Sequence, residues 1–266
     1  MLTKRLIACF DIKNGRVTKA IQFQDNIDVA PAEQLAKAMY DAQVDEIIFY
    51  DIMASAEKRS IDIETVKRVA KCVFIPFTVG GGIRDVNDMY EALKAGAEKI
   101  SVDSMAVRNP SIITDGAKAF GSQCIVLSTQ VKSTDDTNFP SGYEVYIDGA
   151  RKATGLDALE WIKKGAALGA GEICINSIDR DGTLSGYDLP LMQMAEKEVS
   201  VPLIASGGAG QPGHLHDLFS KTQVQAAIIS SMLYSPRLPK NFPVSELKDY
   251  LLSKGDAVRP IRENKT

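Results

Sequence analysis

Two glycine-rich turns give the clearest chemical signal in the sequence. Gly80–Gly82 follows the apolar run 74–79 and precedes a helix-like segment that starts at Asp85, and Gly207–Gly208 follows Val201–Ser206 in a similar way. Glycines between a strand and a helix let backbone N–H groups approach an anion closely, so both turns indicate phosphate binding. A tight turn that requires positive φ and binds nothing is the alternative.

A second group of polar residues follows other expected strands. Asp11 ends the first strand, with Lys19 just beyond it, Asp51 ends the second, and Asp181 lies in the polar segment after the sixth. The aspartates are candidate hydrogen-bond acceptors or general acid/base groups, and Lys19 is a candidate for binding an anion or a carbonyl. Aspartates at such positions also serve as helix N-caps or turn residues, which is the structural alternative for each.

Strand-like and helix-like segments alternate from one end of the chain to the other. The expected strands are 6–12, 46–51, 74–79, 99–102, 124–131, 172–178, 201–206 and 226–231. The expected helices are 32–43, 62–72, 86–95, 110–120, 158–168, 189–198 and 214–221. Strict alternation over this length predicts an α/β fold in one domain over residues 1–266, a closed (β/α)8 TIM barrel.

The second half of the chain repeats the first at a nearly constant offset. Glu46 matches Glu172, 126 residues on, and Ser104 matches Ser231, 127 residues on. Each half then presents one phosphate cradle at the barrel mouth, so a ligand with a phosphate at each end is expected. The pattern predicts two half-barrel repeats, about 1–122 and 123–250.

Composition narrows the function classes. The chain has 266 residues, 45% of them apolar, and a formal net charge of −3, which makes nucleic acid and anionic membranes poor partners. The N-terminus has no signal-type apolar segment, so a cytoplasmic protein is expected. No metal site is expected, because the cysteines and histidines lack ligand spacing, and no cofactor is expected either. These residues are Cys9, Cys72, Cys124, Cys174, His214 and His216.

Four stretches of the sequence closely resemble one protein family. They are Arg5–Val17, Pro76–Ile83, Asn176–Thr183 and Ile204–Gly210. The family is the cyclase subunit of imidazole glycerol phosphate synthase, a (β/α)8 barrel of histidine biosynthesis. The resemblance implies a lyase that receives ammonia from a partner glutaminase in a heterodimer. Its implied substrate is a bis-phosphorylated ribulosyl aminoimidazole carboxamide nucleotide, and its products are imidazole glycerol phosphate and aminoimidazole carboxamide ribotide.

The resemblance also assigns roles to individual residues. It implies an ammonia gate, a charged ring near the barrel floor that is matched by Arg5, Glu46, Lys99 and Glu172. A stabilising salt-bridge layer is the alternative for that ring. Asp11 matches the first of two catalytic aspartates. The residues implied to bind substrate or phosphate are Lys19, Asp51, Gly81, Gly82, Asp103, Ser104, Asn176, Asp181, Gly182, Gly207, Gly208 and Ser231.

The chain departs from the family pattern mainly in the first half of the mouth. Gln130 occupies the position of the second catalytic aspartate, and an amide cannot exchange a proton near neutral pH. Loss of such a group typically costs about a hundredfold to ten-thousandfold in rate. Asp103 replaces an asparagine beside the phosphate, Ile27 replaces a loop arginine, and the segments 20–23 and 30–32 differ. We therefore expect one compromised phosphate site and one intact site.

Three functions are compatible with this mixture of retained and altered residues. The first is a working cyclase subunit with an altered proton donor. The second is a paralogue that keeps the ammonia conduit but feeds another acceptor, such as a sugar that is amidated. The third is a disabled member that serves as a scaffold for a glutaminase or for one phosphorylated ligand. The segment 132–149 is expected to form a loop and hairpin over the mouth, as a lid or a passive excursion, and the tail 256–266 is expected to be flexible.

Overall fold

Eight parallel strands close into a barrel in the computed structural model, which describes residues 2–21, 24–54, 57, 59–236, 238 and 240–262. In order around the barrel they are β1 (Arg5–Lys13), β4 (Glu46–Asp51), β5 (Phe77–Gly80), β6 (Lys99–Val102), β7 (Ile125–Ser133), β10 (Glu172–Ser177), β11 (Leu203–Ser206) and β12 (Ala226–Ile229). Each strand pairs in parallel with the next, and β12 pairs with β1. This closure confirms the predicted (β/α)8 barrel.

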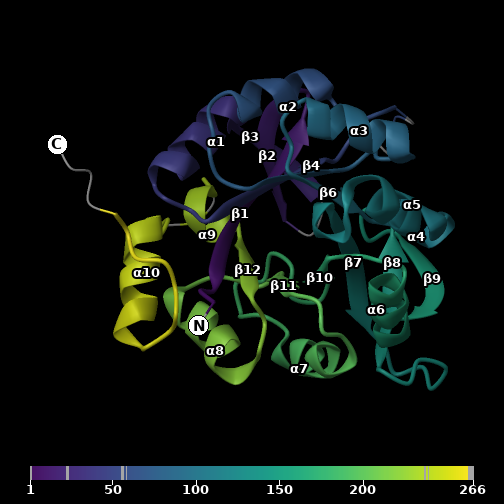
Figure 1. The fold of residues 1–266 in the computed structure, drawn as a ribbon. Helices are drawn as coiled ribbons and strands as arrows, with labels where there is room; N and C mark the ends of the chain where they lie inside the picture. The colour runs from purple at the N-terminus through teal and green to yellow at the C-terminus, as the bar shows by residue number, and fades with distance from the viewer. Residues whose placement is uncertain are drawn as a thin grey trace.

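The helices surround the barrel (Figure 1). They are α1 (Ala32–Asp41), α2 (Ile63–Ala70), α3 (Val86–Lys94), α4 (Ser104–Arg108), α5 (Ser111–Phe120), α6 (Ala158–Ala167), α7 (Leu189–Glu198), α8 (Pro212–Lys221), α9 (Ser231–Tyr234) and α10 (Val244–Ser253), with a 3-10 turn at Ser122–Cys124. The side chains of Asp62, Asp85, Asp157 and Asp188 cap α2, α3, α6 and α7. Within the described ranges, no helix combines the length and apolarity needed to cross a membrane.

Strand periodicity divides the core into two parts. On β1, β4 and β5, side chains that point outward pack against the helices, and Phe10, Phe49 and Phe77 are the largest of them. The alternate side chains point into the barrel, where Ile7 and Ile48 belong to a separate apolar cluster. A period of two residues places every second residue in the barrel lumen, so the chemistry of the lumen follows from alternate positions of each strand.

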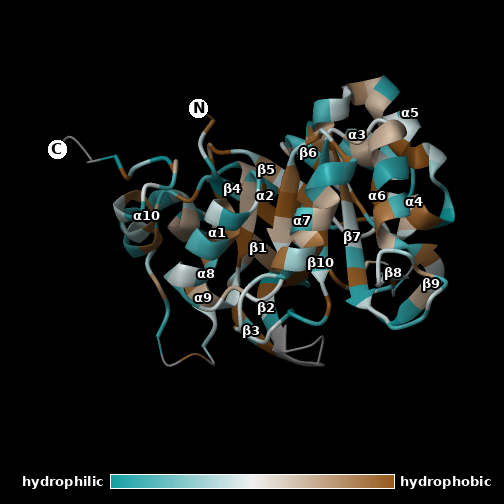
Figure 2. Ribbon diagram, turned by 90° about the horizontal axis from the view of Figure 1, so that it is seen from below, coloured by the Kyte–Doolittle hydropathy of each residue, from teal (hydrophilic) through white to brown (hydrophobic). Residues whose placement is uncertain are grey.

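Each half of the barrel carries an antiparallel hairpin after its first strand. The first is β2 (Arg16–Ile21) with β3 (Gln24–Pro31), and the second is β8 (Tyr143–Ile147) with β9 (Lys152–Asp157). Figure 2 shows both hairpins at the end of the barrel to which β1 and β7 run. The second hairpin was expected from the sequence and the first was not. The half-barrel boundary near residue 122 stays a prediction.

The structure corrects two sequence-based strand boundaries. Phe74 lies three residues before β5 begins, and its side chain is 77% exposed, with one edge-to-face contact to Tyr40 of α1. Ser231 opens α9 and does not end a strand. The flexibility of the tail 256–266 stays a prediction. Its described part makes contacts that include a bridge from Val258 to Lys4 and a hydrogen bond from the Arg262 N–H to the Gln43 side chain.

Candidate active site

A cavity of about 720 Å³ lies at the carboxyl ends of the barrel strands. In a (β/α)8 barrel this is the end at which catalytic residues gather. Every catalytic and substrate-binding residue proposed from the sequence lines the cavity, namely Asp11, Lys19, Asp51, Gly81, Gly82, Asp103, Ser104, Gln130, Asn176, Asp181, Gly182, Gly207, Gly208 and Ser231. The fold therefore brings together residues that are up to 220 positions apart in the chain.

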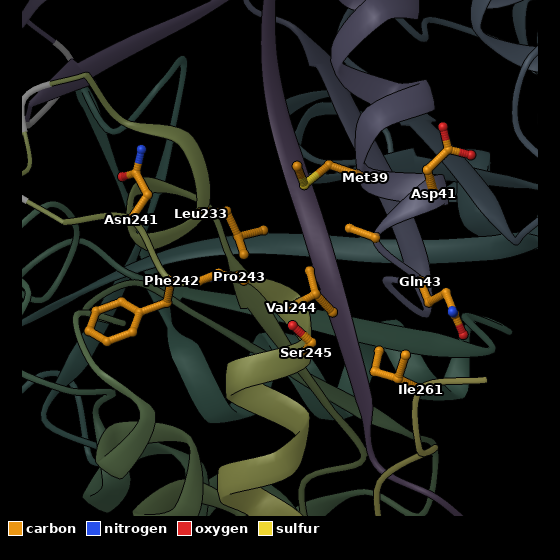
Figure 3. Close-up of a pocket in the computed structure, with 11 residues that line it drawn as sticks. Met39, Asp41, Gln43, Leu233, Asn241, Phe242, Pro243, Val244, Ser245 and Ile261 are labelled. Atoms are coloured by element: carbon orange, nitrogen blue, oxygen red, sulfur yellow. The ribbon is translucent and has the colours of Figure 1, made fainter. Parts of the chain in front are cut away.

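Figure 3 shows a second, smaller cavity, of about 380 Å³, between α1 and the segment that leads into α10. Its lining includes Met39, Phe242 and Val244, and Ile261 closes one side. Among the described residues of this lining, Asp41 is the one ionisable side chain. We therefore assign the chemistry to the large cavity.

The two glycine pairs adopt a backbone that other residues rarely tolerate. Gly81 and Gly82 have φ of +82° and +79°, and Gly207 and Gly208 have φ of +94° and +100°. A Cβ on Gly208 would lie 2.1 Å from the carbonyl oxygen of Gly186. Positive φ and close approach thus require glycine whether or not a phosphate binds. Phosphate binding at these turns stays a prediction.

Lys19, Asp11 and Asp181 form a charged group on one wall of the cavity. The Lys19 ammonium donates a hydrogen bond of 2.9 Å to the Ser230 hydroxyl and lies 3.6 Å from Asp11 Oδ2. Burial lowers the pKa of Lys19, but the charges of Asp11 and Asp181 outweigh it and the pKa is raised. Burial raises the pKa of Asp181, which Lys19 partly opposes. Lys19 therefore stays a cation that can bind an anion or polarise a carbonyl.

Asp103 and Gln130 contact each other on the opposite wall. The Gln130 amide nitrogen donates a hydrogen bond of 2.8 Å to Asp103 Oδ2, and the buried amide oxygen of Gln130 has no hydrogen-bond partner among the described residues. Burial raises the pKa of Asp103 to about 7, although the hydrogen bond from Gln130 opposes the shift. Asp103 is thus a carboxyl group that changes protonation near neutral pH.

This raised pKa makes folding depend on pH in a testable way. Between pH 4 and 7 the folded state holds a proton on Asp103 that the unfolded chain has lost, so the free energy of unfolding falls as pH rises through that window. An asparagine side chain cannot ionise, so we expect Asp103→Asn to stabilise the protein by up to about 4 kcal/mol at pH 8 relative to its effect at pH 4. Urea unfolding at both pH values measures this. The exposed Asp136→Asn serves as the control. If Asp103→Asn changes the free energy of unfolding equally at both pH values, the raised pKa of Asp103 is contradicted.

The Asp51 carboxylate accepts hydrogen bonds from the loop that follows its own strand. The Arg59 guanidinium donates to both carboxylate oxygens, at 2.6 and 2.9 Å, and the N–H groups of Met53, Ala54 and Asp62 add hydrogen bonds of 3.1 to 3.2 Å. Asp51 is 3% exposed. These contacts favour the structural alternative for Asp51, in which the carboxylate organises the loop after β4.

A layer of hydroxyl groups lies in the lumen and lines the cavity. Ser128 on β7 is 2.8 Å from both the Ser101 hydroxyl and the Tyr50 hydroxyl. Gly80 leaves room for the Tyr50 ring, because a Cβ there would lie 2.9 Å from it. Beside this layer, burial raises the pKa of Cys174 to about 12, so its thiol stays protonated and is not a nucleophile near neutral pH.

The four predicted gate residues form a closed ring at the amino ends of their strands. Arg5 bonds to Glu46 at 2.7 Å and to Glu172, and Lys99 bonds to the same two glutamates at 3.0 and 2.9 Å. Burial lowers the pKa of Arg5, but Glu172 and Glu46 outweigh it and the pKa is raised. The ring is neutral overall and lies across the lumen at the end opposite the cavity.

Four arginines of the cavity were missed by the sequence reasoning. They are Arg59, Arg84, Arg108 and Arg151. Arg108 pairs with Asp148 at the tip of the β8–β9 hairpin. The backbone N–H of Asp148 also donates a hydrogen bond of 2.9 Å to the Ser104 hydroxyl. The signal was available for Arg84, Arg108 and Arg59, which follow the ends of β5, β6 and β4 by four, six and eight residues. The hairpin residues needed the tertiary fold.

The altered segments of the first half lie on the first hairpin. Ile27 pairs with Lys19 across β2 and β3, and Pro31 precedes α1 without a side-chain cap. Residues 22 and 23 of the altered segment 20–23 lie outside the described residues.

Comparison with known proteins agrees with this geometry. A family model described as histidine biosynthesis protein matches residues 5–239. The chain is 50% identical over 260 residues to imidazole glycerol phosphate synthase subunit HisF from Desulfosudis oleivorans, which covers 97% of this chain and 99% of that protein. The same subunit from Solidesulfovibrio magneticus is 50% identical over 262 residues, covering 98% and 100%. The chain therefore belongs to the histidine biosynthesis protein family, among the HisF subunits of imidazole glycerol phosphate synthase.

Proposed function

We propose that the chain is the cyclase subunit of a cytoplasmic imidazole glycerol phosphate synthase. In this function it uses ammonia from a partner glutaminase to convert the bis-phosphorylated ribulosyl aminoimidazole carboxamide nucleotide. The products are imidazole glycerol phosphate and aminoimidazole carboxamide ribotide. The observation that carries the proposal is the convergence of Asp11, Lys19 and both glycine pairs on one cavity at the end of the barrel opposite a neutral ion ring.

The glycine pairs and the charged groups of the cavity are placed in a way that suits such a substrate. The glycine pairs come from β5 and β11, which are four strands apart in either direction around the barrel, so one phosphate can bind at each side. Adding ammonia to a carbonyl and closing an imidazole ring both require proton transfers. Asp11 would accept a proton, and Lys19 at 3.6 Å would stabilise negative charge that develops on the carbonyl oxygen.

The other end of the barrel suits the partner. Leu2 precedes β1 and is 89% exposed, and Phe74 precedes β5 and is 77% exposed, so both lie at the end that carries the ion ring. Exposed apolar side chains beside a polar ring are typical of a protein interface. Ammonia released there would pass the ring, then the hydroxyl groups of Tyr50, Ser101 and Ser128, and reach the cavity.

The gate and the salt-bridge layer make different predictions for Lys99→Met. The variant leaves Glu46 and Glu172 with one positive partner, and the resulting negative ring traps ammonium at the entrance. We expect glutamine-dependent turnover to fall about tenfold relative to ammonia-dependent turnover, the scale of one charge-assisted hydrogen bond. Both rates are measured in the complex with a glutaminase, with exposed Lys118→Met as the control. An unchanged ratio with lower stability would favour the salt-bridge layer.

A second candidate function rests on Gln130. The Gln130 amide cannot serve as a general acid or base, which argues against the cyclase chemistry. The ion ring is retained, so the chain could still conduct ammonia to a different acceptor, such as a sugar. Complementation of a histidine auxotroph separates the two functions. The cyclase restores growth without histidine, whereas the conduit binds a glutaminase and does not.

Direct turnover tests the main proposal. The purified chain is given the bis-phosphorylated nucleotide and ammonium, and product is followed beside a Gln130→Asp variant. Turnover by the parent chain supports the cyclase. Silence in both proteins would contradict it and leave the second candidate.

A further inference from the structure

Five carboxylates among the described residues line the large cavity, and they differ in what neutralises them. Asp51 and Asp148 are paired with Arg59 and Arg108 at 2.6 and 2.5 Å. Asp11 and Asp181 share the field of Lys19. Asp103 differs, because its direct partner in the described part of the chain is the neutral amide of Gln130.

The position of Asp103 is unusual for an aspartate before a helix. It stands at the N-cap of α4, yet its side chain makes no capping hydrogen bond there. The carboxylate turns instead toward Gln130 on the neighbouring strand, β7. The cap position was the structural alternative for mouth aspartates, and Asp103 does not follow it.

The pair faces Asp11 across the cavity. In the closed barrel β7 is four strands from β1 in either direction, so Gln130 stands directly opposite the strand that carries Asp11. The hydrogen bond of 2.8 Å ties the Asp103 carboxylate to that position. One carboxyl group therefore stands on each side of a bound substrate.

We infer that Asp103 is the second general acid/base of the cyclase reaction, with Gln130 as its positioning residue. This inference rests on the proposed function. Gln130 binds Oδ2, and Oδ1, which has no hydrogen bond within the described ranges, is left to act on the substrate. The Asp103 carboxyl gives its proton to the nitrogen that leaves, which keeps the electron pair of the broken C–N bond. A proton released from the ammonia-derived nitrogen during ring closure restores the carboxyl, so the residue ends as it began.

Two further observations agree with this role. Burial raises the pKa of Asp103 to about 7, and a proton donor or acceptor works best when its pKa is near the working pH. The buried Gln130 oxygen has no partner in the described part of the chain and is an acceptor available to the substrate. Asp103 and Gln130 thus divide two tasks, with proton transfer assigned to the carboxyl and orientation of the substrate to the amide.

Exchange of the two residues tests the inference. The variants are Asp103→Asn, the double exchange Asp103→Asn with Gln130→Asp, and exposed Asp136→Asn as the matched control. Ammonia-dependent kcat and KM are measured from pH 5.5 to 9 at constant free ammonia. We expect Asp103→Asn to lower kcat by about 10² to 10⁴ with little change in KM, and to remove a limb of the pH profile near 7. The double exchange should recover kcat to within about tenfold of the parent chain.

The outcomes separate the inference from the proposed function. An active parent whose Asp103→Asn variant keeps kcat within about threefold, or changes KM alone, would overturn the inference and leave the cyclase function standing. A silent parent with an active double exchange would overturn both, because Asp103 then fails to supply the proton. Silence in both would contradict the cyclase function, and the inference would fall with it. Urea unfolding of each variant confirms that it is folded.

Discussion

Ammonia-dependent turnover by Asp11→Asn is expected to fall by about 10² to 10⁴ relative to the parent chain. Asparagine has nearly the same shape as aspartate and keeps an oxygen toward Lys19, so the wall formed by Lys19 and Ser230 should stay in place. The amide cannot accept a proton, and the substrate loses the base that faces Asp103. Because the substitution conserves shape, the loss should appear in kcat and leave KM within a few-fold.

The control for this variant is Asp115→Asn, which makes the same chemical change at an exposed position on α5. Steady-state kinetics of both variants are compared at constant free ammonia. Turnover by Asp11→Asn that matches the control would remove Asp11 from the reaction. Because Asp11 and Asp103 stand on opposite walls, the two losses also report whether each half of the mouth contributes a proton-transfer group.

The largest effect on stability is expected at a buried ion pair outside the active site. Lys248 on α10 is 0% exposed, and its ammonium lies 2.9 Å from Asp45 Oδ1 and 2.7 Å from the carbonyl oxygen of Gln43. Asp45 also accepts a hydrogen bond of 2.9 Å from the N–H of Leu6. Asp45→Ala leaves the ammonium buried without its counter-charge, so the free energy of unfolding should fall by about 3 to 5 kcal/mol.

A double variant separates the effect of an unpaired buried charge on stability from the effect of lost packing. Replacing a buried ion pair by apolar side chains is often close to neutral, so Asp45→Ala with Lys248→Met should recover much of the loss. The exposed pair Asp41 and Lys37 provides the control, because Asp41→Ala should cost less than about 1 kcal/mol. Urea unfolding measures all three. Equal losses in the single and double variants would mean that packing of α10, and not charge, sets the stability.

The sequence alone determined the architecture and predicted where the chemistry lies. Alternating strand-like and helix-like segments predicted the barrel, and the polar residues after the strands predicted a site at its mouth. The structure places Asp11, Gly81 and Gly207 on one cavity there. The ring of Arg5, Glu46, Lys99 and Glu172 was implied by the family resemblance, and ion pairs join these residues in the structure. The barrel and the position of its mouth follow from local periodicity and from strand direction, and both can be inferred from the order of residues in the sequence.

Only the tertiary structure decided what each mouth carboxylate does. Asp51, Asp103 and Asp181 look alike in the sequence, yet Asp51 is neutralised by Arg59, Asp181 is influenced by Lys19, and Asp103 is held by an amide. The sequence presented Gln130 as a lost catalytic group, whereas the fold places it against a carboxyl group whose pKa is near 7. The physical reason is that ionisation depends on burial and on partners from neighbouring strands, and neither is encoded in the spacing of residues along one strand.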